Sequence, residues 1–253
     1  RGFGLASGVF LKFDGAIDPA TLPADPAASA APGSSLFLID IDPRSKARGT
    51  RTPLWIEFRD TGDAWRDDHL LAAMPVPGLP LEPDTLYALV VTDDLHGADA
   101  APVTASPFVE QMRAGAATTS FEAAALPLFE KLWKQLEREE GLSREHVVGA
   151  TVFRTGDPTA PMQSVERFVR AKVRPEATNL ALDAARSTGA YWTFTGTFLA
   201  PQFQTGTPPF SAAGSGIYQF DGKGRPLVQR HDVLSFVLTV PKERDDGTLP
   251  LPK

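Results

Sequence analysis

The chain contains no cysteine among its 253 residues. Disulfide bonds, thiolate nucleophiles and cysteine-based zinc sites are therefore excluded. Long apolar runs are also missing, because no stretch approaches the roughly 18 to 20 residues that a membrane-spanning helix requires. The net charge is −6, and no run of lysine and arginine exceeds two adjacent residues. We therefore expect no nucleic-acid partner, since binding to phosphates depends on clustered cations.

The nucleophile motif Gly-x-Ser-x-Gly does not occur either. The nearest match, Ala213-Gly-Ser-Gly216, has glycine on both sides of Ser215 and precedes a predicted strand. A nucleophile elbow instead connects a strand to a helix. His231 and Asp232 are neighbours in a predicted strand, so their side chains point to opposite faces and cannot pair as a catalytic dyad does. We predict that this chain contains no catalytic residue.

Metal and cofactor motifs are equally scarce. The four histidines are far apart, and no paired His/Glu ligand motif is present. Asp40 and Asp42 lie on one face of a predicted strand, which would suit calcium, but no third ligand is nearby. We interpret them as a solvated strand end. We expect neither a metal nor a cofactor.

Proline and glycine, by contrast, are abundant and spread along the chain, with 23 and 21 residues. This distribution favours many short strands separated by turns, and in residues 1–105 it indicates an antiparallel sandwich. The predicted strands are residues 8–14, 35–41 and 52–58, and residues 81–92 are predicted to be a turn followed by a strong strand. The side chains that we expect to be at least half buried are Phe10, Phe13, Leu38, Trp55 and Tyr87.

In residues 106–189 the sequence pattern changes from mainly strands to mainly helices. Residues 121–140 are predicted to be helical, because Leu128, Leu132 and Leu136 repeat every four residues on one apolar face. A strand is expected over residues 147–153, and a second helix after Asp157-Pro158.

Residues 190–253 return to strands. Aromatic and threonine residues predict a strand over 191–198, and Val233–Val240 reads as a well-buried strand that Pro241 ends. The polar tail 242–253 is interpreted as a segment that leads into a further strand. We therefore expect one side of Val233–Val240 to meet either a missing catalytic segment or a second chain. The whole chain is predicted to be mainly β with helical insertions.

Three segments resemble the strands that open and close bacterial Ig-like surface domains. The opening is matched by Val9-Phe-Leu-Lys-Phe-Asp14 and Ile17-Asp-Pro-Ala-Thr-Leu22, and the close by Leu81-Glu-Pro-Asp-Thr-Leu-Tyr-Ala-Leu-Val-Val-Thr92. The resemblance covers roughly residues 1–105 and implies an Ig-like β-sandwich there.

A second resemblance covers most of the chain, by the order and spacing of its segments. The segments are Val147-Val-Gly-Ala-Thr-Val-Phe-Arg-Thr155, Gly196-Thr-Phe-Leu-Ala-Pro-Gln-Phe203, Asp221-Gly-Lys-Gly-Arg-Pro226 and Val233-Leu-Ser-Phe-Val-Leu-Thr-Val-Pro241. Together they look like the N-terminal region of bacterial extracellular lipases and esterases of the large α/β-hydrolase type. The resemblance implies that an α+β segment begins the hydrolase sheet, and that the catalytic serine, acid and histidine lie beyond Lys253.

The resemblance also implies a domain plan and a partner. Residues 1–105 would be the Ig-like sandwich, 106–189 a helical connecting region with one strand, and 190–253 a β-hairpin region leading into the hydrolase core. The partner would be the catalytic segment, in the same precursor or as a separate chain, and a lipid or ester substrate would be reached through it. The protein would be secreted, periplasmic or associated with a bacterial outer membrane, without a membrane span.

Phe198, Phe203 and Phe210 are the candidate lining of an acyl cleft, because ligand pockets are largely apolar. The favoured interpretation is that these rings fill a seam between two domains. Two other functions stay open: a free-standing Ig-like cell-surface binding module without enzymatic activity, and a complete enzyme.

Overall fold

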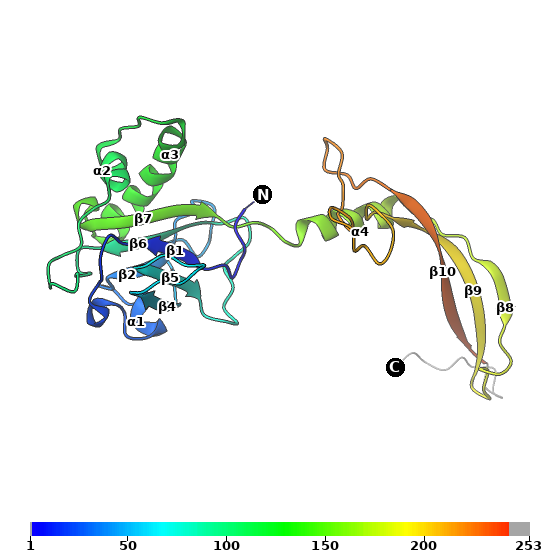
Figure 1. The fold of residues 1–253 in the computed structure, drawn as a ribbon. Helices are drawn as coiled ribbons and strands as arrows, with labels where there is room; N and C mark the ends of the chain where they lie inside the picture. Colours follow the sequence, from blue (N-terminus) through cyan, green and yellow to red (C-terminus); the bar gives the residue numbers. More distant parts are fainter. Residues whose placement is uncertain (1, 243–253) are drawn as a thin grey trace. The chain divides into compact units, whose positions relative to one another are not determined.

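The computed structural model describes residues 2–242 of the chain. They form a mixed α/β structure that is mostly sheet, with ten strands in three antiparallel sheets and four α-helices (Figure 1). The mainly β composition is therefore confirmed. Contacts divide the chain into two compact units, with the division between Pro158 and Thr159. None of the helices in residues 2–242 has the length and apolar character that a membrane crossing needs.

The first unit contains two sheets, in the strand orders β3-β2-β6-β7 and β1-β5-β4, and every pair within them is antiparallel. Its strands are β1 (Val9–Lys12), β2 (Leu36–Asp40), β3 (Arg51–Thr52), β4 (Leu54–Arg59), β5 (Leu70–Pro75), β6 (Leu86–Thr92) and β7 (Val147–Arg154). Its α-helices are α1 (Pro26–Ala30), α2 (Pro107–Ala114) and α3 (Ser120–Gln135).

Strand β6 lies at the centre of this unit, and all seven of its residues are buried. Its two faces contribute to different cores, because successive side chains point to opposite sides of a sheet. Leu86, Ala88 and Val90 pack with the apolar stripes of α2 and α3. Leu89 and Val91 pack against the β1-β5-β4 sheet. Figure 1 shows these layers, with α2 and α3 on one side of the β6–β7 pair and β1, β5 and β4 on the other.

Helix α3 confirms the helix predicted from the leucine repeat. It begins with a capping box, in which Thr119 and Glu122 satisfy each other's backbone N–H groups. It continues as a π-helical turn over Leu136–Glu140 and ends at Gly141, whose φ of 67° suits glycine. Trp133 anchors the helix to α2, since its indole N–H donates to the carbonyl of Met112 at 3.2 Å.

Two of the five side chains expected to be buried in the first unit are exposed. Leu38 and Tyr87 are buried and Phe13 is partly buried, but Phe10 and Trp55 are 63% and 61% exposed. The reason is strand alternation: Leu54 points into the core, so its neighbour Trp55 points outward. The prediction was therefore wrong for Phe10 and Trp55.

The observed units differ from the three segments expected from the sequence. Strand β7 pairs with β6 along Leu86–Thr92, and α2 and α3 supply part of the same core. These contacts join residues 106–158 to the first unit, so the structure has one division near residue 158 where the sequence suggested boundaries at 105 and 189.

The second unit contains α4 (Ala160–Lys172) and the sheet β8-β9-β10. Strands β8 (Thr178–Leu182), β9 (Tyr191–Gln202) and β10 (Arg230–Pro241) run side by side as a curved sheet (Figure 1). Strand β10 pairs with β9 along its full length of 12 residues. The expectation that Val233–Val240 is well buried was wrong, because β10 is an edge strand of the described sheet and most of its apolar side chains are exposed.

Truncation of Leu38 and of Trp55 tests this description of the first unit. We expect Leu38→Ala to lower the free energy of unfolding by about 3 kcal/mol, because it leaves a cavity in a closed core. Trp55→Ala serves as the matched control, and at an exposed position it should cost less than about 1 kcal/mol. Urea denaturation followed by circular dichroism measures both, and equal losses would contradict the outward orientation of Trp55.

Candidate functional site

The three phenylalanines expected to line a cleft have different packing partners. Phe203 is buried against Phe168 of α4, edge to face, with ring centroids 5.7 Å apart. Phe198 lies 6.1 Å from Phe236 on the β9–β10 pair. Phe210 packs under the guanidinium of Arg230, 5.7 Å from the ring centroid. Only Phe203 therefore contributes to a closed interior.

Two histidine–aspartate pairs are present in the first unit. His146 Nδ1 lies 2.9 Å from Asp93 Oδ2, and His69 Nδ1 lies 2.8 Å from Asp60 Oδ1. The hydrogen bond with Asp93 raises the pKa of His146 above its usual value. An activated serine also needs its hydroxyl to reach the base. No hydrogen bond among residues 2–242 joins either imidazole to a serine, and the hydroxyl of Ser215 donates to the carbonyl of Ala212.

Asp40 and Asp42 are buried, at 2% exposure each, so their interpretation as a solvated strand end was wrong. Asp42 Oδ2 accepts hydrogen bonds from Arg154 Nη1 at 2.7 Å and from the backbone N–H of Leu86 at 3.2 Å. Its Oδ1 accepts from Arg44 Nε at 3.2 Å. Burial alone would raise the pKa of Asp42, but hydrogen bonds from Arg44 and Arg154 outweigh it and hold this pKa well below the usual value.

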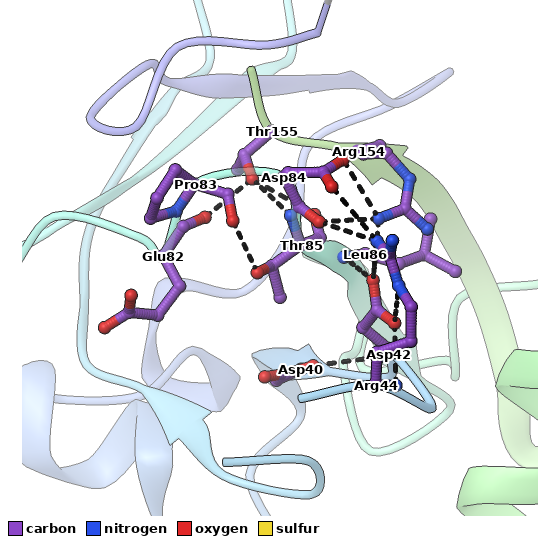
Figure 2. Close-up of polar contacts among 10 residues, drawn as sticks. All are labelled: Asp40, Asp42, Arg44, Glu82, Pro83, Asp84, Thr85, Leu86, Arg154 and Thr155. Atoms are coloured by element: carbon purple, nitrogen blue, oxygen red, sulfur yellow. Dashed lines mark hydrogen bonds and ion pairs between the residues drawn. The ribbon is translucent and has the colours of Figure 1, made fainter. Parts of the chain in front are cut away.

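The same cluster fixes the turn before β6 (Figure 2). Arg154 Nη1 also donates to the carbonyl of Asp84 at 2.7 Å. The hydroxyl of Thr155 donates to the carbonyl of Glu82 at 2.6 Å and accepts from the backbone N–H of Thr85 at 2.9 Å. These contacts tie together the adjacent ends of β2, β6 and β7. Within the described part of the chain, no group of three or more acidic, histidine or cysteine residues is arranged to hold a metal. Because its hydrogen bonds join the ends of these three strands, the cluster acts as a structural clamp.

The first unit also has an open cavity of about 860 Å³ beside β1 and β7. Apolar side chains such as Leu11, Ile17 and Val148 line it, together with Asp14 and Asp99. Asp99 Oδ1 already accepts the backbone N–H of Ala101 at 3.0 Å. Polar and apolar groups contribute to the lining in similar measure. The serine in this lining, Ser106, caps α2 by accepting the backbone N–H of Val109 at 3.3 Å.

The most unusual surface in the described residues is one face of the β8-β9-β10 sheet. Register pairs Phe198 with Leu234, Gly196 with Phe236 and Phe194 with Leu238, so these side chains share one face. We call this surface the apolar face. Its members are Leu182, Trp192, Phe194, Phe198, Leu234, Phe236, Leu238 and Val240. The signal for it was already in the sequence, since Trp192, Phe194 and Phe198 alternate with threonines at a period of two, which is typical of a one-sided strand.

The free edge of β10 adds to this surface. Strand β10 pairs with β9 on one side, and no strand among residues 2–242 pairs with its other side. Natural edge strands usually carry charges, prolines or bulges that prevent pairing with other chains. Residues Val233–Val240 contain none of these. The edge and the apolar face together therefore form a surface suited to contact with another protein segment.

A scan against models of known protein families finds no match for this chain, and a search of curated protein sequences finds none either.

The Asp42 clamp predicts a pH dependence of stability. Because the pKa of Asp42 is lower in the folded protein than in the unfolded chain, its contribution is fully present above the ordinary value of 3.8. It is lost as the pH falls from there toward the folded pKa, where the unfolded chain binds more protons.

We expect Asp42→Asn to cost about 2 kcal/mol of unfolding free energy at pH 7, because the charge-assisted hydrogen bonds to Arg44 and Arg154 are lost. The cost should shrink below pH 4. The control is Asp67→Asn, at an exposed carboxylate 3.3 Å from Lys12, which should change stability by less than about 1 kcal/mol. Urea titrations between pH 3 and pH 7 measure both, and a cost for Asp42→Asn that does not change with pH would contradict the clamp.

Proposed function

We propose that this chain is the non-catalytic N-terminal part of a secreted bacterial lipase or esterase, a carboxylic-ester hydrolase. Its role is to support the catalytic domain. The observation that carries the proposal is the apolar, unpaired edge strand β10 together with the exposed apolar face beside it. The family resemblance of the sequence supports the identity of the partner, because in that family the corresponding strand belongs to the hydrolase sheet.

In this proposal the β8-β9-β10 sheet is the beginning of a larger sheet. A strand of the catalytic segment pairs with the free edge of β10 and satisfies its outward backbone groups. Side chains of the same segment cover the apolar face, which removes Trp192, Leu234 and Leu238 from water. Residues 1–105, which lie in the first unit, correspond to the Ig-like domain of the family.

The site geometry is consistent with a supporting role. Of the four histidines in residues 2–242, His69 and His146 each pair with an aspartate, and no hydrogen bond joins these two to a serine. The carboxylate of Asp42 is occupied by arginine and backbone contacts. The catalytic serine, acid and histidine would then lie in the partner segment. The protein would work outside the cytoplasm, in the periplasm, at the outer membrane or in the medium.

A second function is favoured by one observation in the first unit. The outer face of the β1-β5-β4 sheet exposes Phe10, Trp55 and Met74, and the register pairs Trp55 with Met74. Exposed aromatic side chains on an open sheet are typical of a contact surface. This surface supports the alternative of a cell-surface binding module without enzymatic activity.

Serine labelling separates the two functions. The isolated chain should neither hydrolyse a p-nitrophenyl ester above background nor react with a fluorophosphonate, because it lacks a nucleophile paired with a base. A protein expressed from the complete natural reading frame should be labelled on one serine outside residues 1–253. Labelling of the isolated chain that disappears in Ser215→Ala would overturn the proposal, as would an unlabelled full-length protein.

Self-association tests the exposed sheet itself. We expect the isolated chain to dimerise or aggregate, because its apolar face and edge lack their partner. Val237→Lys on β10 should weaken association by about tenfold, since a lysine on an edge strand disfavours pairing. The control is Ile217→Lys, which lies outside the sheet at a similar exposure, 54% against 56%. Size-exclusion chromatography with light scattering gives the masses, and a stable wild-type monomer would favour the binding module.

A further inference from the structure

The second unit contains a cavity of about 520 Å³ between the end of α4 and the β9–β10 pair. This volume lies in the range of small-molecule sites. Its apolar lining residues, which we call the floor, are Phe168, Val173, Leu199, Pro201 and Val228. Phe168 is held in place by its edge-to-face contact with the buried Phe203. Packing within the unit therefore fixes Phe168, whereas Leu199 and Val228 are 59% and 39% exposed.

Two of the three charged residues that line this cavity are basic. They are Lys172 and Arg174, and the third is the acidic Glu176; His231 also lines the cavity. Arg174 Nη1 donates to the carbonyls of Arg170 and Val173, at 3.0 and 2.9 Å. In the described part of the chain neither Lys172 nor Arg174 has a carboxylate partner within 4.0 Å, whereas the nearby Arg170 pairs with Glu166 and Arg230 with Asp232.

These two features together define the ligand. An apolar floor excludes a strongly hydrated ligand, because it offers little to replace lost hydrogen bonds. Two cations without carboxylate partners favour an anionic group at the opening, and Glu176 disfavours a ligand with several negative charges. We propose that this cavity binds a single-chain fatty acid, with its carboxylate at Lys172 and Arg174 and its alkyl chain along Leu199 and Phe168.

This inference extends the proposed function. It rests on that function only for where the fatty acid comes from. Hydrolysis of an acyl ester releases a carboxylate of this class, so the cavity would hold the released product. Binding itself involves only residues of this chain. It is noncovalent, and it is independent of any catalytic serine.

The experiment measures binding of laurate to the isolated chain by displacement of 11-(dansylamino)undecanoic acid, below the concentration at which light scattering detects association. Dodecyltrimethylammonium, with an alkyl chain of the same length but a cationic head group, is the chemical control. We expect laurate to displace the probe and the ammonium compound to be at least tenfold weaker, because its charge repels Lys172 and Arg174.

Two pairs of variants locate the site. Lys172→Glu should weaken laurate binding by about tenfold, as expected for losing one charge-assisted contact, while Lys223→Glu in an exposed turn should not. Leu199→Ser should weaken binding, whereas Leu180→Ser, at a similar exposure outside the cavity, should not (59% against 56%). Circular dichroism melts verify that each variant folds.

Several outcomes would overturn the inference. Equal displacement by laurate and by dodecyltrimethylammonium would show that alkyl chains bind without charge recognition. Equal effects of Leu180→Ser and Leu199→Ser would place the alkyl chain outside the cavity. If laurate binds but the fluorophosphonate labels no serine of the full-length protein, this inference stands and the proposed hydrolase function is rejected. If laurate does not bind but a serine of the full-length protein is labelled, this inference is rejected and the hydrolase function stands.

Discussion

Strand β6 must bury both of its faces, and the rest of the first unit follows from that constraint. A strand of seven buried residues needs a partner on each edge and a layer over each face. Strands β2 and β7 pair with the two edges of β6. Helices α2 and α3 cover one face of β6, and the β1-β5-β4 sheet covers the other. The ion cluster around Asp42 closes the end of this arrangement, where charges can be buried only because arginines and backbone N–H groups satisfy them.

Strand β10 has a similar apolar composition but the opposite environment. Among residues 2–242 it pairs on one side only, and its apolar face is partly exposed. The contrast between β6 and β10 is the physical basis of the functional proposal. The first unit covers both faces of β6 with its own elements, whereas the second unit presents an apolar sheet that a further protein segment would stabilise. The cavity beside α4 differs from both, because it combines an apolar floor with cations that lack carboxylate partners.

Several features were predictable because their signal is local. The leucine repeat placed α3, and the aromatic and β-branched runs placed β2, β6, β9 and β10 to within a few residues. Strand β5 was missed, because Leu70-Leu-Ala-Ala-Met-Pro75 lacks β-branched and aromatic residues and forms a strand only through pairing with β1 and β4. Of the three candidate site residues only Phe203 proved to be enclosed, and the cavity near it depends on Phe168 and Lys172, which lie far away in the sequence.

The sequence by itself therefore determined the class of structure, the periodicity of its elements and the absence of a nucleophile elbow and of cysteine chemistry. Only the tertiary structure decided which face of each strand is covered. Alternation defines two faces in β1 and β4, but the packing of the opposite sheet left Phe10 and Trp55 outside. It also decided that Asp40 and Asp42 are buried and that β10 is an edge. Burial depends on segments distant in the chain, and a local pattern contains no information about which of them will be present to cover it.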